Sequence, residues 1–151
     1  MIIGFSGTRH GMTMPQKMEM ANQLIGLKPE KFIHGDCIGA DQQAHSIVDG
    51  AVCEIIIRPG RLPAGNNIKQ ANCASFPSIS RVILLDPEDL LDRNLGIVKY
   101  SDAMIITPRE MTEQNSGGTW MTYRMAINAR KPIFLILPDG TTELKIGDRT
   151  D

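Results

Sequence analysis

The chain has 151 residues, which suits one domain and leaves no room for two ordinary ones. Its 16 basic and 17 acidic side chains give a net charge of −1, which disfavours a nucleic-acid coat or a membrane-surface role. No stretch approaches the roughly 20 apolar residues of a membrane span, and the first apolar run is too short for a signal peptide. Three cysteines without a C-x-x-C pair favour neither a disulfide framework nor a zinc site, so we expect a cytoplasmic protein.

Short apolar runs rich in β-branched residues recur along the chain. In order they are Ile2–Phe5, Lys31–His34, Val52–Ile57, Arg81–Leu85, Ala103–Thr107 and Pro132–Leu137. Runs of this length and composition are typical of strands that are buried on both faces, as in a parallel sheet.

Helical patterns lie between these runs. Thr13 and Gln16 have the spacing of a capping box, and the helix that follows is expected to turn an apolar stripe toward the core. The stripes are Met14, Met18, Ala21, Leu24 and Ile25; Ala40, Ala44, Ile47 and Val48; Ile68, Ala71 and Ala74; Leu95, Ile97 and Val98; and Met121, Met125, Ala126 and Ala129.

The remaining segments are expected to be loops. Pro59–Asn67 and an irregular stretch near Phe76–Asp92 connect the elements, and a polar tail follows from about residue 138. Strands that alternate with helices predict an α/β fold with a doubly wound, mostly parallel sheet, in one domain over residues 1–151.

The loops that follow the strands are where a ligand is expected. Open parallel sheets bind ligands at the carboxyl ends of their strands. Glycine, small hydroxyl and arginine residues gather in four such loops, which are Ser6–Gly11, His34–Asp41, Arg58–Arg61 and Pro108–Thr119.

The first two loops offer a turn and a helix start. Gly7 and Thr8 form a turn whose amides can point outward, next to the charge of Arg9. Gly35 and Gly39 precede a helix whose amino end suits a phosphate. Asp41 either caps that helix or accepts hydrogen bonds from a ribose. Glycine-rich turns also occur where nothing binds, and that alternative stays open here.

The stretch Asn115–Ala126, N-S-G-G-T-W-M-T-Y-R-M-A, leads into the last helix. Glycines 117 and 118 let the backbone approach an anion closely, and Thr119 and Thr122 add hydroxyl groups. Trp120 is either a core residue or the wall of a pocket.

Several kinds of chemistry are disfavoured. The chain contains neither G-x-x-x-x-G-K-[ST] nor G-x-G-x-x-G, which argues against ATP hydrolysis and ordinary NAD-dependent hydride transfer. His10, His34 and His45 lack metal-ligand spacing, so we predict no metal site and no cofactor. Of the three, His10 is the best placed to contact a ligand.

Together the motifs H-G-D-C-I-G-A-D-Q-Q-A, R-N-L-G-I-V-K-Y-S-D-A-M-I-I-T-P and S-G-G-T-W-M-T-Y-R-M-A, with the first turn, resemble the SLOG superfamily. This group includes the Smf/DprA DNA-processing proteins, the Lonely Guy phosphoribohydrolases and small stand-alone members, many of them phage-borne. The resemblance covers Ile2 to about Leu137. It implies a Rossmann-like three-layer sandwich that binds a nucleotide-derived ligand, in families that commonly form homodimers or higher homo-oligomers.

Carried across by motif, the resemblance implies a pocket that draws on three of the four loops. The loop residues are Ser6, Gly7, Thr8, Arg9, Gly35, Asp36, Gly39, Asp41, Ser116, Gly117, Gly118 and Thr119. Because of their positions in the loops, Arg58 and Trp120 are further candidates for contact with the ligand. Arg93, followed by Asn94, matches an arginine of the Lonely Guy enzymes, and Pro108 matches the end of their strand.

One position departs from the family. The catalytic glutamate of the Lonely Guy enzymes falls on Thr122, which cannot supply the charge that cleavage of an N-glycosidic bond requires. Asp36, Asp41, Glu110 and Glu113 are candidate substitutes, and Arg93 is a further catalytic candidate. Whether the protein is an enzyme therefore stays open.

The leading prediction is a sensor or sequestering protein for a nucleotide-derived small molecule. Its phosphate would bind residues 117–119, helped by Arg93 and Arg9, and its base would stack on Trp120 or near Arg58. The alternative is a nucleotide N-glycosidase or phosphoribohydrolase. Binding of single-stranded DNA is more distant, because seven aromatic residues and a charge of −1 make nucleic acid a poor partner.

Overall fold

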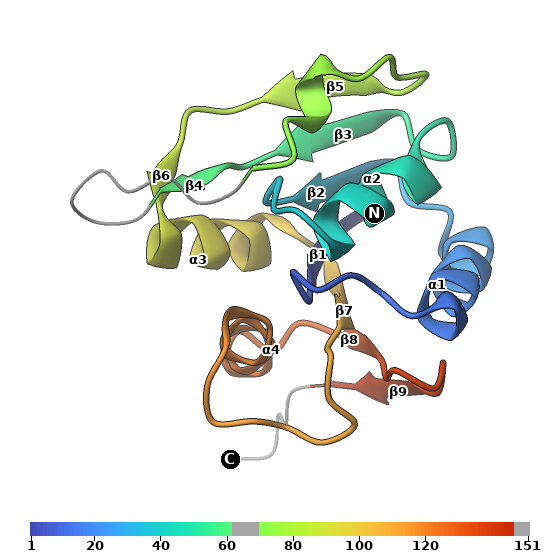
Figure 1. Cartoon of the computed structure of the whole chain (residues 1–151), viewed down its shortest axis with the longest axis vertical. Helices are drawn as coiled ribbons and strands as arrows, with labels where there is room; N and C mark the ends of the chain where they lie inside the picture. The colour runs from blue at the N-terminus through green and yellow to red at the C-terminus, as the bar shows by residue number, and fades with distance from the viewer. Residues whose placement is uncertain (62–69, 147–151) are drawn as a thin grey trace.

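The computed structural model describes residues 1–61 and 70–146. They form a Rossmann-like α/β sandwich of three layers, with a mostly parallel sheet between two layers of helices (Figure 1). The strands of the main sheet are β1 (Ile2–Gly7), β2 (Lys31–His34), β3 (Glu54–Ile57), β5 (Arg81–Leu84), β7 (Ala103–Thr107), β8 (Ile133–Ile136) and β9 (Thr142–Lys145).

The strand order is β5-β3-β2-β1-β7-β8-β9. The chain starts in the middle with β1, builds outward through β2, β3 and β5, and then returns to add β7 and β8 on the other side. The strand order therefore reverses between β1 and β7, which is the topological switch point where such sheets bind ligands.

Helices α1 (Met14–Leu27) and α2 (Ala40–Val48) share one core with Ile3, Phe5 and Phe32. On the other face, α3 (Leu90–Tyr100) and α4 (Gly118–Asn128) pack against residues such as Ile33 and Ile106, which alternate with those of the first face. A short 3-10 helix, η2 (Cys73–Ser75), and a small sheet of β4 (Gly60–Arg61) with β6 (Glu88–Asp89) complete the described elements. Among these residues, no helix is both long and apolar enough to cross a bilayer.

The six predicted strands are confirmed within a few residues, and so is the capping box at Thr13. The predicted core stripe of α1 is wrong for three of its five residues. Met14, Met18 and Ile25 are 64%, 63% and 71% exposed, whereas Leu24 is buried as predicted, together with Gln16 and Met20, which the stripe did not include.

Two other predictions need correction. Of the predicted third helix, Ile68 lies outside the described residues, Ala71 is not helical, and Ala74 belongs to η2. The tail contains a strand that the sequence did not predict, because β9 pairs antiparallel with β8, Ile133 opposite Lys145 and Ile136 opposite Thr142.

Candidate functional site

The loops after β1 and β7 meet at the switch point. The Thr8 amide donates to the Thr107 carbonyl at 3.0 Å, and the Thr8 carbonyl accepts from the first amide of α2, that of Ala40, at 3.0 Å. Farther out, Arg109 Nη1 lies 3.2 Å from His10 Nε2. The predicted free amide at Thr8 is therefore already used, and the outer part of the first loop carries the accessible polar groups.

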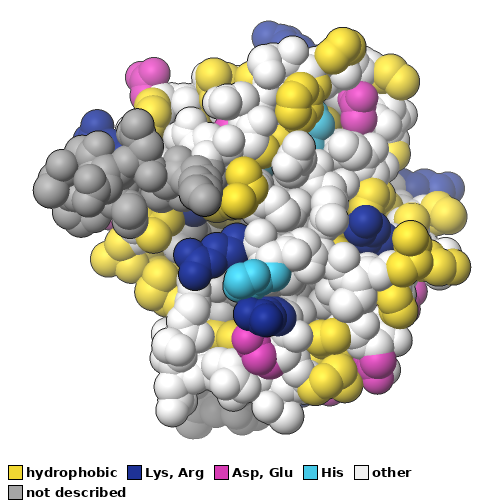
Figure 2. Space-filling view, viewed as in Figure 1, with side chains coloured by type: hydrophobic (Ala, Val, Ile, Leu, Met, Phe, Trp, Pro, Cys, Tyr) yellow, Lys and Arg dark blue, Asp and Glu magenta, His cyan; other side chains and the backbone are white. Residues whose placement is uncertain are grey.

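That first loop is fixed from inside. The Thr8 hydroxyl accepts from the His10 amide at 3.1 Å, and Gln43 Oε1 accepts from the Met12 amide at 2.7 Å. Arg9 and His10 are exposed between these anchors. In Figure 2 a histidine lies between basic side chains near the middle of this face.

The turn before α2 is occupied by the protein's own carboxylate. Asp41 accepts from the amides of Gly35 at 3.2 Å and Cys37 at 3.1 Å, and it is 6% exposed. Burial raises the pKa of Asp41, and Arg93 pulls it in the opposite direction. Because a buried acidic group already lies at this helix end, the α2 turn is a poor seat for a phosphate.

Arg93 completes the support of the same turn. Its Nη1 donates to the carbonyl of Gly35 at 2.7 Å, and its Nε donates to Asn94 Oδ1 at 2.7 Å. Arg93 is only 5% exposed. Arg93, which we predicted to bind a phosphate, therefore stabilises the loop after β2 instead.

Asp36 is likewise directed inward. Its φ of 61° is left-handed, and its carboxylate accepts from the Cys73 amide at 2.9 Å. Its carbonyl accepts from the amide of Ala71 at 2.8 Å. Asp36 therefore ties η2 to the loop after β2 and does not face a ligand.

A buried cluster that the sequence did not predict lies beside Asp36. Ligand atoms of His34, His45 and Cys73 lie within 4.8 Å of one another. The Asp36 amide donates to His34 Nδ1 at 2.9 Å, so the proton of the neutral His34 ring is on Nε2, 2.9 Å from His45 Nδ1. A metal ion on that nitrogen would require an imidazolate, so the cluster fits a hydrogen-bonded chain better than a metal centre.

The amino end of α4 contrasts with that of α2. Both helices have a glycine N-cap with a positive φ and no side-chain cap, but no acidic residue lies in the first turn of α4. A Cβ added at Gly117 or Gly118 would meet no atom within 4 Å. Among the described residues, nothing accepts a hydrogen bond from the amides of Gly118, Thr119 and Trp120, or from the hydroxyls of Ser116 and Thr119.

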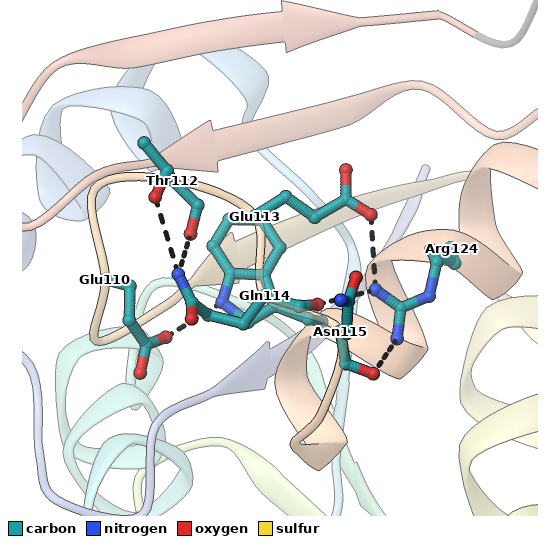
Figure 3. A network of polar contacts seen from close by, with 7 residues as sticks. Glu110, Thr112, Glu113, Gln114, Asn115 and Arg124 are labelled. Atoms are coloured by element: carbon teal, nitrogen blue, oxygen red, sulfur yellow. Dashed lines mark hydrogen bonds and ion pairs between the residues drawn. The ribbon is translucent and has the colours of Figure 1, made fainter.

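The loop before α4 is held by the helix that it leads into (Figure 3). Arg124 Nη1 donates to the Gln114 carbonyl at 2.8 Å and pairs with Glu113 at 3.2 Å. Trp120 Nε1 donates to Glu110 at 2.8 Å. Trp120 is 3% exposed and packs in the core, and it also lines a hollow beneath this loop, so both alternatives left open for it hold in part.

The other predicted residues have definite positions. Gly7 is closely packed, since a Cβ there would collide with Thr107 and Ala40. Arg58 pairs with Glu88 at 2.6 Å and lies over the Tyr100 ring. The carbonyl of Pro108 accepts a hydrogen bond from Gln16. Thr122 is buried, and its hydroxyl donates to the carbonyl of Gly118. Gly39 packs against Arg9.

Ser6 and Asn94 belong to the layer of α3 and α4. Gly4, two residues before Ser6 on the same strand face, contacts Ser101 at the end of α3. Asn94 is 7% exposed, and its amide nitrogen has no partner among the described residues. These groups lie on the same side of the sheet as the start of α4.

Two residues at the switch point, Gln16 and Arg109, have roles that the sequence did not predict. Gln16 Nε2 donates to the carbonyls of Pro108 and Ile136, and so joins α1 to the ends of β7 and β8. The capping-box spacing identified Gln16 as a helix residue, but not this second role. Arg109 directly follows Pro108, and only the meeting of two distant loops shows its importance.

Two hollows in the described part of the chain are lined by neither the first loop nor Gly117 and Gly118. One of about 450 Å³ lies between α1 and α2 and is mainly apolar. Another of about 230 Å³ lies beneath the loop before α4, beside Trp120 and Tyr123. The polar groups described above are therefore the better guide to a site. No family model, no curated protein and no solved structure matches this chain.

Proposed function

We propose that this protein binds a nucleotide or a nucleotide-derived ligand at the carboxyl edge of the sheet, with a phosphate on the first amides of α4. The observation that carries the proposal is the open amino end of α4, where three amides have no acceptor and two glycines have free space around them. Free amides and the helix dipole both favour an anion.

The surroundings support a ligand larger than a phosphate. Asn94 is almost buried and has an unpartnered amide nitrogen, which suits an acceptor on a ribose or a base. Ser6 adds a hydroxyl from the same layer. The resemblance to the SLOG superfamily also predicts phosphate binding at this turn. We therefore propose, as part of the same hypothesis, that the chain belongs to that superfamily.

Binding without hydrolysis is the form of this function that the geometry supports best. Asp36 and Asp41 accept from backbone amides, while Glu110 and Glu113 pair with Trp120 and Arg124. All four candidate substitutes for the missing glutamate are thus engaged within the protein, and Thr122 is buried. The proposed role is therefore a sensor or sequestering protein.

The substitution Gly118→Val tests the proposed phosphate site on the first amides of α4, which we call the α4 seat. We expect calorimetry to show AMP affinity at least tenfold lower in this variant, because the new side chain blocks the approach to the amides. The free energy of unfolding should change by less than about 1 kcal/mol, since the position is open and exposed.

Gly26→Val is the matched control, because Gly26 is another exposed helical glycine with no atom within 4 Å of an added Cβ. It should leave AMP affinity unchanged. AMP binding that survives Gly118→Val would refute the seat. Free base released from AMP would favour the hydrolase instead, and salt-sensitive retention of an oligonucleotide would favour single-stranded DNA binding.

A further inference from the structure

We propose that the exposed cluster Arg9, His10 and Arg109 binds a second phosphate, so that the preferred ligand is a nucleoside diphosphate. This inference rests on the proposed function, because it assigns the first phosphate to α4. It adds a charge requirement that the α4 seat alone does not impose.

The cluster consists of two arginines and a histidine, and none of them pairs with a carboxylate among the described residues. Arg58, Arg61 and Arg124 each pair with a carboxylate within 3.2 Å. By contrast, Arg109 has only the imidazole of His10, and the guanidinium of Arg9 has no partner among the described residues. The next acidic residue in the chain, Glu110, is engaged by Trp120.

His10 gives the cluster its order. A guanidinium nitrogen can only donate, so in this contact Arg109 Nη1 donates to His10 Nε2 at 3.2 Å. The His10 amide is in turn held by Thr8. Arg109 is therefore positioned before any ligand arrives, which lowers the entropy cost of recruiting it.

The chain itself links the cluster to the α4 seat. The two loops that carry it leave β1 and β7 at the switch point, and the β7 loop runs on from Arg109 into α4. Figure 2 shows basic side chains on both sides of a histidine on this face. A ligand that bridges both places needs two linked anionic groups, which a diphosphate provides.

A small diphosphate fits better than a nucleic acid. Two arginines and a histidine make a compact cluster, whereas a single strand of nucleic acid needs a basic groove. Trp120 is buried, so it gives the bases of a nucleic acid no surface on which to stack.

Calorimetry with AMP and ADP in EDTA tests the second seat. We expect the wild-type protein to bind ADP about tenfold more tightly than AMP, since one charge-assisted hydrogen bond is worth about that factor. Arg109→Gln should weaken ADP about tenfold and AMP less than twofold. Arg81→Gln is the matched control, because Arg81 is exposed on the edge strand β5, away from the switch point.

The outcomes separate this inference from the proposed function. AMP binding that depends on Gly118, together with equal affinity for ADP, would overturn the second seat and leave the first. An equal loss of ADP binding in Arg81→Gln would also overturn it, as a general charge effect. Inorganic pyrophosphate that binds as tightly as ADP would overturn the nucleoside part. If an oligothymidine bound more tightly than ADP and this binding required Arg109, the ligand of the cluster would be a nucleic acid and not a nucleoside diphosphate.

Discussion

The peptide units around Gly35 are held from both sides by charged side chains. Asp41 accepts from the amide of Gly35, and Arg93 donates to its carbonyl. A Cβ at Gly35 would collide with the Arg93 guanidinium, which explains why this position is glycine. Two charged residues that resemble catalytic or ligand-binding groups in the sequence thus define the shape of a loop.

The buried His34 makes stability depend on pH. Burial, with smaller contributions from His45 and Arg93, lowers the pKa of His34 to about 3 from its ordinary 6.5. Between these values the unfolded chain binds more protons than the folded one, so stability falls as the pH is lowered. We expect His34 to remove about 2 kcal/mol from the free energy of unfolding between pH 7 and pH 5, as measured in urea.

Two variants assign this loss to the buried ring. His34→Gln cannot take up a proton, so the difference between the two pH values should shrink by about that amount. His10→Gln changes an exposed ring and should leave the difference intact. Equal unfolding free energies of the wild type at pH 7 and pH 5 would contradict the assignment.

At the scale of elements, the start of α1 is hydrogen-bonded to a segment that is distant in the sequence. The Thr13 hydroxyl accepts from the Gln16 amide at 3.1 Å and donates to the Pro138 carbonyl at 2.7 Å. We expect Thr13→Ala to lower the free energy of unfolding by about 1–2 kcal/mol, because it removes both a helix cap and a tertiary bond. Urea denaturation measures this change.

Thr13→Ser keeps the hydroxyl and is the control for that substitution. It should lie within about 0.5 kcal/mol of the wild type. An alanine variant as stable as the serine variant would show that the cap contributes nothing.

The same helix shows where sequence patterns fail. The predicted stripe combined the exposed Met14 and Met18 with the buried Leu24, and it left out the buried Met20. The buried face of α1 begins at Gln16, which donates to two carbonyls from β7 and β8. A buried polar residue that binds another part of the sheet cannot be recognised from local periodicity.

The candidate site was predictable where one segment builds it. Glycines before a helix and the lack of an acidic neighbour mark the start of α4 in the sequence. The turn before α2 has similar glycines, but the fold directs Asp41 back onto it. The pairing of His10 with Arg109 spans 99 positions and follows only from the adjacency of β1 and β7.

At the scale of the molecule, the sheet has a protected centre and two outer strands. Strands β1 and β7 each have neighbours on both sides, whereas β5 and β9 end the order in the described part of the chain. We expect hydrogen–deuterium exchange to be slowest in β1 and β7 and fastest in β5 and β9, because outer strands open locally at lower cost. Uniform protection across the strands would contradict this order.

Finally, the close packing of Gly39 against Arg9 limits where this protein can be redesigned. Gly39 has a φ of 87°, and a Cβ there would collide with the backbone of Arg9. No larger amino acid can be introduced at that contact without moving the first loop. Attempts to alter ligand preference should therefore target the outward side chains, where substitutions leave the main-chain framework intact.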